Sequence, residues 1–387
     1  MTARILLPGA DGTTERLTLR EPVGWQRPAA PATSRIAYAA AHVVADPYAD
    51  NAPGRPATLD WDATMAVRRN LWSWGLGVAE AMDTAQRGMG LDWAATRELI
   101  RRSAAEAAAC GGRIVAGAAT DQAPAVLNSL DEVIAAYTEQ VAYVQSCGAT
   151  AVVMASRQLV ALATGPDDYL HVYDRVLSQT GAPVLLHWLG DMFDPALAGY
   201  WGSQELDTAT KTFVSLVHAH ADVIDGVKVS LLDADREIGL RESLPATVRV
   251  YTGDDYNYPQ LIQGDGRHYS HALLGAFATI APAASAALHR LDAGDEAGFL
   301  EILDPTVPLS RHVFAPPTQY YKTGIAFLSW LNGLQPGFTM VGGLHSGRGV
   351  PHLVQLFRLA DAAGLLLDPD LAAARMTGYL SVAGVIA

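Results

Sequence analysis

Lys228 lies in the middle of DGVKVSLLD, residues 225–233, between two valines of a segment that predicts a short buried strand. Burial disfavours the charged ammonium and lowers the pKa of a lysine. A neutral amine can add to a carbonyl carbon and form an imine, which is the Schiff base of covalent catalysis. The position and the residue type together predict a nucleophilic lysine.

Lysine is rare in this chain, which holds 27 Lys and Arg residues but only three lysines, at positions 211, 228 and 322. A structural cation paired with a carboxylate, such as Asp254 or Asp255, is the alternative role for Lys228. Arginine could fill that role equally well, and this chain uses arginine for almost every positive charge. The choice of lysine therefore favours the Schiff base. Lys322 is interpreted more simply, as a residue at the start of a helix.

His187, in APVLLHWLG, ends another predicted strand. A histidine there can be a core residue, a metal ligand, or an acid/base group with a pKa near the working pH. Other polar residues follow neighbouring predicted strands, and in a parallel barrel the catalytic groups come from these carboxyl ends. They are His42, Asp46, Asp83, Thr84, Thr120, Asp121, Ser156, Arg157, Thr252, Asp254 and Asp255.

A metal site is the alternative use of these residues. His42, Asp83, Asp121, His187 and Asp254 could gather around an ion if the strand ends meet. No HxH or HExxH spacing supports such a site. A metal-dependent isomerase or hydrolase thus remains the second hypothesis, and a barrel that binds a ligand without turnover is the third.

The elements that would position these residues alternate regularly from residue 35 onward. The strands are apolar throughout, as expected for a parallel sheet that is buried on both faces. Eight strand–helix units in about 250 residues fit a (β/α)8 TIM barrel. A doubly wound sheet would need fewer units and usually a glycine-rich first turn, and no GxGxxG follows the first strand. The predicted strands are 35–46, 76–82, 113–120, 149–156, 182–190, 224–231, 247–255 and 271–282, with helices over 60–75, 92–112, 129–148, 167–181, 203–222 and 233–244.

The chain divides into three predicted parts. Residues 1–34 form an arm or β-hairpin around a glycine-containing turn, residues 35–285 form the barrel, and residues 286–387 form helices that pack on the barrel.

Composition narrows the possible partners. The chain is 50% hydrophobic and 17% charged, which suits a globular protein with a large core. Its formal charge of −13 argues against binding of nucleic acid or of an anionic membrane, which need a basic face. Cys110 and Cys147 lack CxxC spacing, and no signal pattern or membrane-spanning apolar run is found. We therefore expect a cytoplasmic protein with a small-molecule partner.

Several motifs resemble those of the dihydrodipicolinate synthase / N-acetylneuraminate lyase family of class I aldolases. Residues 75–100 resemble the family's second strand, its GTTGE loop and the following helix. GVKVS resembles the family's GIKDS-type segment, which carries the Schiff-base lysine, and VYTGDD resembles the SGDD after the seventh strand. The similarity runs through most of residues 35–300 and identifies the chain as a divergent branch.

The resemblance implies an aldolase or lyase in which Lys228 forms the imine, with no cofactor and with a homodimer or homotetramer as the usual assembly. Two departures matter for the substrate. The family's two adjacent threonines, which bind the keto-acid carboxylate, correspond to Thr84 and Ala85, and His187 stands at about the place of the family's proton-relaying tyrosine. Thr84, together with Asp83, Thr252 and Asp254, would orient substrate. We expect a sugar-derived carbonyl compound or keto acid other than pyruvate.

Overall fold

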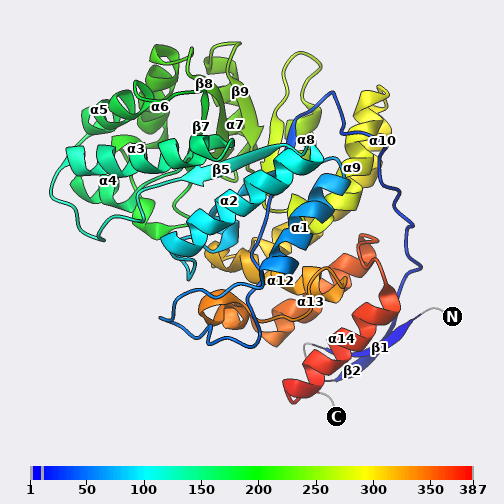
Figure 1. Cartoon of the computed structure of the whole chain (residues 1–387). Helices are drawn as coiled ribbons and strands as arrows, with labels where there is room; N and C mark the ends of the chain where they lie inside the picture. Colours follow the sequence, from blue (N-terminus) through cyan, green and yellow to red (C-terminus); the bar gives the residue numbers. More distant parts are fainter. Residues whose placement is uncertain (1–2, 10–12, 386–387) are drawn as a thin grey trace.

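Eight parallel strands close into a barrel, which confirms the predicted (β/α)8 fold. The computed structural model describes residues 3–9 and 13–385, and Figure 1 shows the strands enclosed by helices in the upper part of the molecule. Around the barrel the order is β10-β3-β4-β5-β6-β7-β8-β9, so every strand pairs with its sequence neighbours. The strands are β3 (Ala37–Ala40), β4 (Gly77–Glu80), β5 (Ile114–Ala118), β6 (Thr150–Val153), β7 (Val184–Leu189), β8 (Ile224–Ser230), β9 (Arg249–Thr252) and β10 (His271–Leu274).

Helices cover the outside of the barrel and begin at side chains suited to that position. Asp60, Asp92 and Ser129 each accept a hydrogen bond from a backbone N–H in the first turn of the helix that follows. These caps explain why each helix begins directly after a polar residue, where the periodic pattern of apolar residues starts. The helices of this layer are α1 (Trp61–Ser73), α2 (Trp93–Cys110), α3 (Leu130–Ser146), α4 (Arg157–Leu162), α5 (Pro166–Leu177), α6 (Leu206–Ala219), α7 (Ala234–Ser243), α8 (Tyr258–Gln263) and α9 (Phe277–Asp292).

The barrel buries a cluster of apolar side chains and also three polar side chains of β7 and β8, namely His187, Lys228 and Ser230. Ala40, Ala79, Val152, Leu185 and Leu273 form one buried cluster inside the barrel. Successive side chains of a strand point to opposite faces. The register of the strands therefore decides which polar residues face the interior.

All eight strands are shorter than the predicted segments, and the first and the eighth differ most. The first spans only Ala37–Ala40, and the eighth spans His271–Leu274, with helix α9 starting at Phe277 inside the segment that was predicted as strand. Residues of α9 such as Phe277, Ile280 and Ala284 are fully buried. A helix buried on most sides lacks an amphipathic period, and its apolar run therefore resembles a buried strand.

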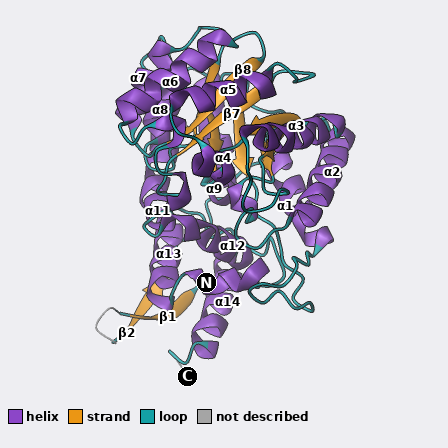
Figure 2. Ribbon diagram, turned by 90° about the vertical axis from the view of Figure 1, so that its left-hand side faces the viewer, coloured by secondary structure: helices purple, strands orange, loops and turns teal. Residues whose placement is uncertain are grey.

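Helices α12 (Tyr321–Leu331), α13 (Val350–Ala362) and α14 (Pro369–Val382) lie below the barrel in Figure 1, whereas α10 (Glu296–Leu303) packs on α9. The N-terminal hairpin lies beside α14. The hairpin pairs β1 (Arg4–Pro8) with β2 (Thr14–Thr18) antiparallel, while residues 10–12 of its predicted turn lie outside the described residues. Figure 2 shows the hairpin and both chain ends at the same end of the molecule. No helix in the described part of the chain is long and apolar enough to span a membrane. The C-terminal helices are α10 (Glu296–Leu303), α11 (Val307–Val313), α12 (Tyr321–Leu331), α13 (Val350–Ala362) and α14 (Pro369–Val382).

The chain between the hairpin and the barrel runs along α13. Arg20 N donates to Asp361 Oδ1 over 2.9 Å, and the indole nitrogen of Trp25 donates to the carbonyl oxygen of Gly364 over 3.1 Å. Helix α9 itself extends across residue 285, where the sequence placed a boundary. The division into three parts stays a prediction, because α9 of the barrel packs against α12 of the C-terminal region.

Candidate active site

Lys228 is buried on β8, with 5% of its surface exposed. Burial lowers the pKa of its amine, while the negative charges of Asp83 and Asp255 act in the opposite direction. Gly253 lies directly against the lysine, since a Cβ at that position would stand 2.8 Å from Lys228 Cε. The missing side chain at Gly253 leaves room for the lysine chain. The amine thus occupies a desolvated position next to two carboxyl groups.

His187 on β7 is paired in register with Lys228. The imidazole is fully buried, its Nε2 shares a 3.1 Å hydrogen bond with Ser230 Oγ, and among the described residues its Nδ1 has no hydrogen-bond partner. Burial lowers the pKa of His187 well below its ordinary value, and the positive charge of Lys228 adds to this. The ring is therefore neutral near pH 7 and can accept a proton at one nitrogen.

Asp83 and Thr84 follow β4 in a single turn of 3-10 helix, Asp83–Ala85. Positive φ values at Ala81 and Gln86 bracket this turn. Gln86 is held by its Nε2, which donates to the carbonyl oxygen of Val341 over 2.7 Å. The C-terminal region thus fixes the loop that carries Asp83.

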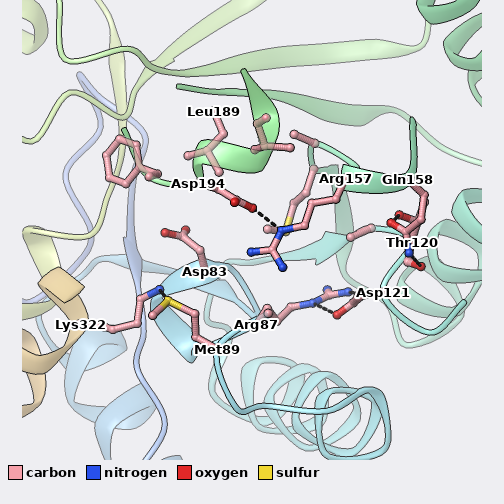
Figure 3. A pocket seen from close by; sticks show the side chains of 16 residues that line it. Asp83, Arg87, Met89, Thr120, Asp121, Arg157, Gln158, Leu189, Asp194 and Lys322 are labelled. Carbon is pink, nitrogen blue, oxygen red and sulfur yellow. Dashed lines mark hydrogen bonds and ion pairs between the residues drawn. The ribbon is translucent and has the colours of Figure 1, made fainter. Parts of the chain in front are cut away.

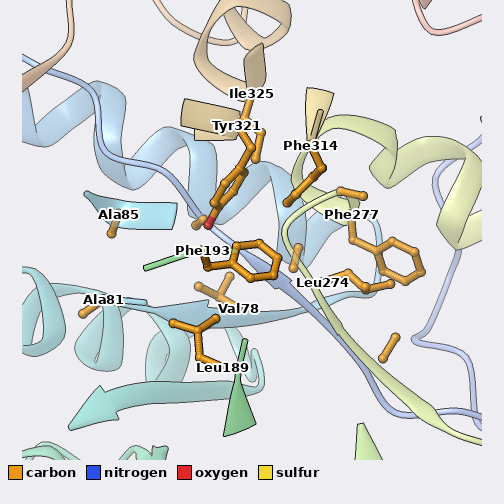
Figure 4. Close-up of a cluster of buried hydrophobic side chains, with 14 of the residues drawn as sticks. Val78, Ala81, Ala85, Leu189, Phe193, Leu274, Phe277, Phe314, Tyr321 and Ile325 are labelled. Atoms are coloured by element: carbon orange, nitrogen blue, oxygen red, sulfur yellow. The ribbon is translucent and has the colours of Figure 1, made fainter. Parts of the chain in front are cut away.

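The phenol of Tyr321, from the start of α12, reaches this turn. Its hydroxyl donates to Asp83 Oδ2 over 2.7 Å and shares a 2.6 Å hydrogen bond with Thr84 Oγ1. The ring stacks on Phe314 with centroids 4.4 Å apart and meets Phe193 edge-on (Figure 4). Burial, followed by the charge of Asp83, raises the pKa of Tyr321 well above its ordinary value, and the phenol remains a donor.

Thr252 and Asp254 are engaged away from Lys228. Asp254 accepts hydrogen bonds from the backbone N–H groups of Tyr256 and Asn257 over 2.8 and 3.0 Å, which caps a turn. Thr252 Oγ1 accepts from Asp254 N over 3.1 Å and also interacts with Glu237 of α7. The register explains this, because Tyr251 is the partner of Lys228 and its neighbour Thr252 points to the other face.

Asp255 is the carboxyl group of this loop that interacts with Lys228. Its Oδ1 accepts from Ala276 N over 2.8 Å, and burial raises its pKa to about 8 against the opposing charge of Lys228. The alternation that turns Asp254 away brings Asp255 back to the interior side.

A cavity of about 110 Å³, partly open to solvent, lies over the carboxyl ends of β4 to β7 (Figure 3). The described residues that line it include Asp83, which interacts electrostatically with Lys228, but not Lys228 itself. The cavity is lined by Asp83, Arg87, Gly88, Met89, Ala119, Thr120, Asp121, Met154, Ala155, Arg157, Gln158, Leu189, Phe193, Asp194, Leu197 and Lys322.

Lys322 is a second buried lysine at this cavity. It lies in the first turn of α12, as the sequence predicted, but only 2% of its surface is exposed. Figure 3 shows its side chain beside Met89 and on the same side of the cavity as Asp83. Sequence reasoning missed this role and that of Tyr321. The rarity of lysine was the one signal that could have drawn attention to Lys322.

The residues of the alternative metal site have separate partners. His42 Nε2 shares a 2.7 Å hydrogen bond with Gln335 Oε1, and Asp121 forms an ion pair with Arg87. Within residues 3–9 and 13–385, no three His, Cys, Asp or Glu side chains gather in a way that could hold an ion. The metal-dependent alternative is therefore not favoured.

The closed parallel barrel and its surrounding helices place this protein among (β/α)8 barrels. Residues 5–385 match the family described as "Protein of unknown function (DUF993)", and the chain belongs to that family. A comparison with curated proteins found no match.

Solved structures with the same fold include three of the dihydrodipicolinate synthase family. A prophage protein of that family from E. coli K12, in complex with pyruvate, is 16% identical with a TM-score of 0.64, covering 86% of this chain and 99% of that one. The synthase from Acinetobacter baumannii complexed with pyruvate is 16% identical, TM-score 0.63, covering 86% and 100%. The synthase from Aquifex aeolicus is 13% identical, TM-score 0.63, covering 86% and 99%. The predicted resemblance is confirmed for the fold.

Proposed function

We propose that this protein is a carbon–carbon lyase or aldolase in which Lys228 forms a Schiff base with a carbonyl substrate. The observation that carries the proposal is the buried amine at the carboxyl end of β8, with a lowered pKa and a neutral histidine next to it. A desolvated lysine keeps a larger fraction of nucleophilic amine at neutral pH than an exposed one.

In the proposed reaction, Nζ of Lys228 attacks the carbonyl carbon, and the resulting carbinolamine loses water to give a protonated imine. Cleavage of the bond between the α- and β-carbons sends its electron pair toward the imine nitrogen and leaves an enamine. The hydroxyl proton of the departing aldehyde goes to His187, which acts as general base. Protonation of the enamine carbon and hydrolysis of the imine then release the second product and the amine.

The loop after β4 supports a proposal about the substrate class. Thr84 is held by Tyr321, and Ala85 offers no hydroxyl, so the two-threonine carboxylate site of the resembling family is incomplete. Two similar structures hold pyruvate. We propose a sugar-derived keto compound or keto acid larger than pyruvate, oriented by Asp83 and Thr84. If pyruvate-type keto acids alone give an adduct, this substrate proposal is wrong.

Borohydride trapping followed by peptide mass analysis tests the mechanism. The protein is reduced in the presence of pyruvate, longer keto acids and polyhydroxylated ketones, and the modified lysine is identified. We expect a stable adduct on Lys228 that is lost in Lys228→Met and retained in Lys211→Met, whose lysine is exposed. A folded protein that remains unmodified, or that carries its adduct on Lys322, contradicts the proposal.

The resemblance also predicts a homo-oligomer, which light scattering of the purified protein measures directly. A monomer at micromolar concentration would contradict this part of the proposal.

A further inference from the structure

Lys322 is a buried cation without an oxygen acceptor. Among the described residues its one hydrogen bond runs from Nζ to Met89 Sδ over 3.3 Å, and a thioether is a weak acceptor. A buried ammonium is normally paired, because desolvation of an unpaired charge is costly. Burial lowers the pKa of Lys322, with Asp83 and Asp194 acting in the opposite direction and Arg157 in the same one. The ring of Tyr321, with its centroid 5.1 Å from Nζ, is a second contact, so Nζ has a thioether and an aromatic ring for partners and can still donate to an oxygen anion.

Arg157 brings a second cation to the same cavity. Its Nε donates to Asp194 Oδ2 over 2.6 Å, while its two terminal nitrogens make no hydrogen bond to another described residue. A Cβ at Gly88 would lie 3.6 Å from Nη2, and this places the guanidinium over the Gly88 backbone at the cavity wall. Figure 3 shows Arg157 extending between Asp194 and Arg87. The free edge of a guanidinium suits two oxygens of one carboxylate or phosphate.

The other charged residues of the cavity are already paired. Arg87 forms an ion pair with Asp121, and Asp194 is bound by Arg157. Asp83 interacts electrostatically with both Lys228 and Lys322 but lies in a hydrogen bond with Tyr321. One carboxylate therefore interacts with both lysines, and the cavity retains unused donors on Lys322 and Arg157.

We propose that Lys322 and Arg157 bind an anionic group of the substrate, a carboxylate or a phosphate ester, in the cavity that they line together with Asp83. The substrate is then an acidic carbonyl compound whose anion lies several atoms from the carbonyl carbon. This inference rests on the proposed function in one respect, namely that the bound anion is a group of the substrate. The anion site itself is independent of Lys228.

Isothermal titration at fixed ionic strength tests the site with inorganic phosphate and malonate as probes and glycerol as the neutral control. We expect saturable binding of at least one anion, weakened at least tenfold in Lys322→Met and in Arg157→Gln. Lys211→Met, which removes an exposed lysine, should bind like the unaltered protein. The probe that binds more tightly distinguishes a phosphate ester from a carboxylate.

The outcome is separable from that of the lyase proposal. Lys228→Met should retain anion binding although it loses imine trapping. Because Arg157 is about half exposed, Arg157→Gln tests the site even if Lys322→Met fails to fold. No saturable binding of either anion, or undiminished binding in Arg157→Gln and in a folded Lys322→Met, overturns the inference whatever the trapping result.

Discussion

The phenol of Tyr321 donates a 2.7 Å hydrogen bond to Asp83 Oδ2, although the two residues are 238 positions apart. The contact joins a helix outside the barrel to the loop after β4. It brings the C-terminal region into the environment of Lys228.

Tyr321→Phe removes this hydroxyl and leaves the buried Thr84 hydroxyl without the partner that it has now. We expect the free energy of unfolding to fall by about 1–3 kcal/mol, the usual cost of an unsatisfied buried group. Urea denaturation measures the change. Tyr320→Phe, at the preceding half-buried position, is the control and should change stability by less than about 0.5 kcal/mol. Equal effects of the two substitutions would show that the hydrogen bond contributes nothing.

Asp83→Asn should lower the pKa of Lys228 further, because the carboxylate favours the ammonium form. More amine is then neutral at a given pH, so the rise of imine trapping with pH should move to lower pH. Trapping rates between pH 6 and 10 give the profile. Asp191→Asn, at an exposed residue of the loop after β7, should leave the pH profile of trapping unchanged. A shift to higher pH in Asp83→Asn would contradict the electrostatic account.

Gly253→Ala inserts a methyl group 2.2 Å from Ser230 Oγ and 2.8 Å from Lys228 Cε. The lysine must move, and overpacking of this kind costs about 1–3 kcal/mol of stability. We expect imine trapping to fall at least tenfold in a protein that still folds. In Gly239→Ala, where the added Cβ meets no atom within 4 Å, trapping should be unchanged. Normal trapping in Gly253→Ala would mean that the fit around Lys228 is loose.

Arg68 and Glu80 form a fully buried ion pair beneath the site, with two parallel 2.8 Å hydrogen bonds. Arg68→Met leaves the Glu80 carboxylate buried without its cation, which costs about 3–5 kcal/mol. Arg69 lies on the same helix, α1, and forms an exposed ion pair with Glu106 of α2. Arg69→Met breaks this pair and should cost at most about 1 kcal/mol of stability. Thermal or urea unfolding compares the two variants. Similar losses in both would contradict the buried-pair argument.

Glu237 makes stability depend on pH. Burial raises its pKa to about 8 from an ordinary value of 4.5, so folding favours the protonated acid. Its contribution to stability is complete below about pH 4.5 and is lost as the pH rises toward 8, by up to about 1.4 kcal/mol per unit. Glu237→Gln keeps a neutral acceptor for Ser270 and should flatten this decline. Glu242→Gln, at an exposed position of the same helix, should retain the decline of stability with pH. An unchanged slope in Glu237→Gln would show that Glu237 does not cause the decline.

The sequence predicted the barrel because its eight apolar segments and the helices between them keep a regular order. The prediction of elements failed where a single apolar run contains both a strand and the start of a helix. The segment 271–282 reads as one strand, but only its first four residues pair in the barrel. The first turns of α9 are buried on most sides, and their apolar run therefore resembles a buried strand.

The sequence by itself determined that a lysine stands near the end of a buried strand, because strand, burial and residue type are all local properties. Only the tertiary structure decided which groups share its space. The register between β8 and β9 turns Asp254 away and brings Asp255 inward, and the packing of α12 adds Tyr321 and Lys322. Register and helix packing depend on contacts between distant parts of the chain, which no single segment specifies.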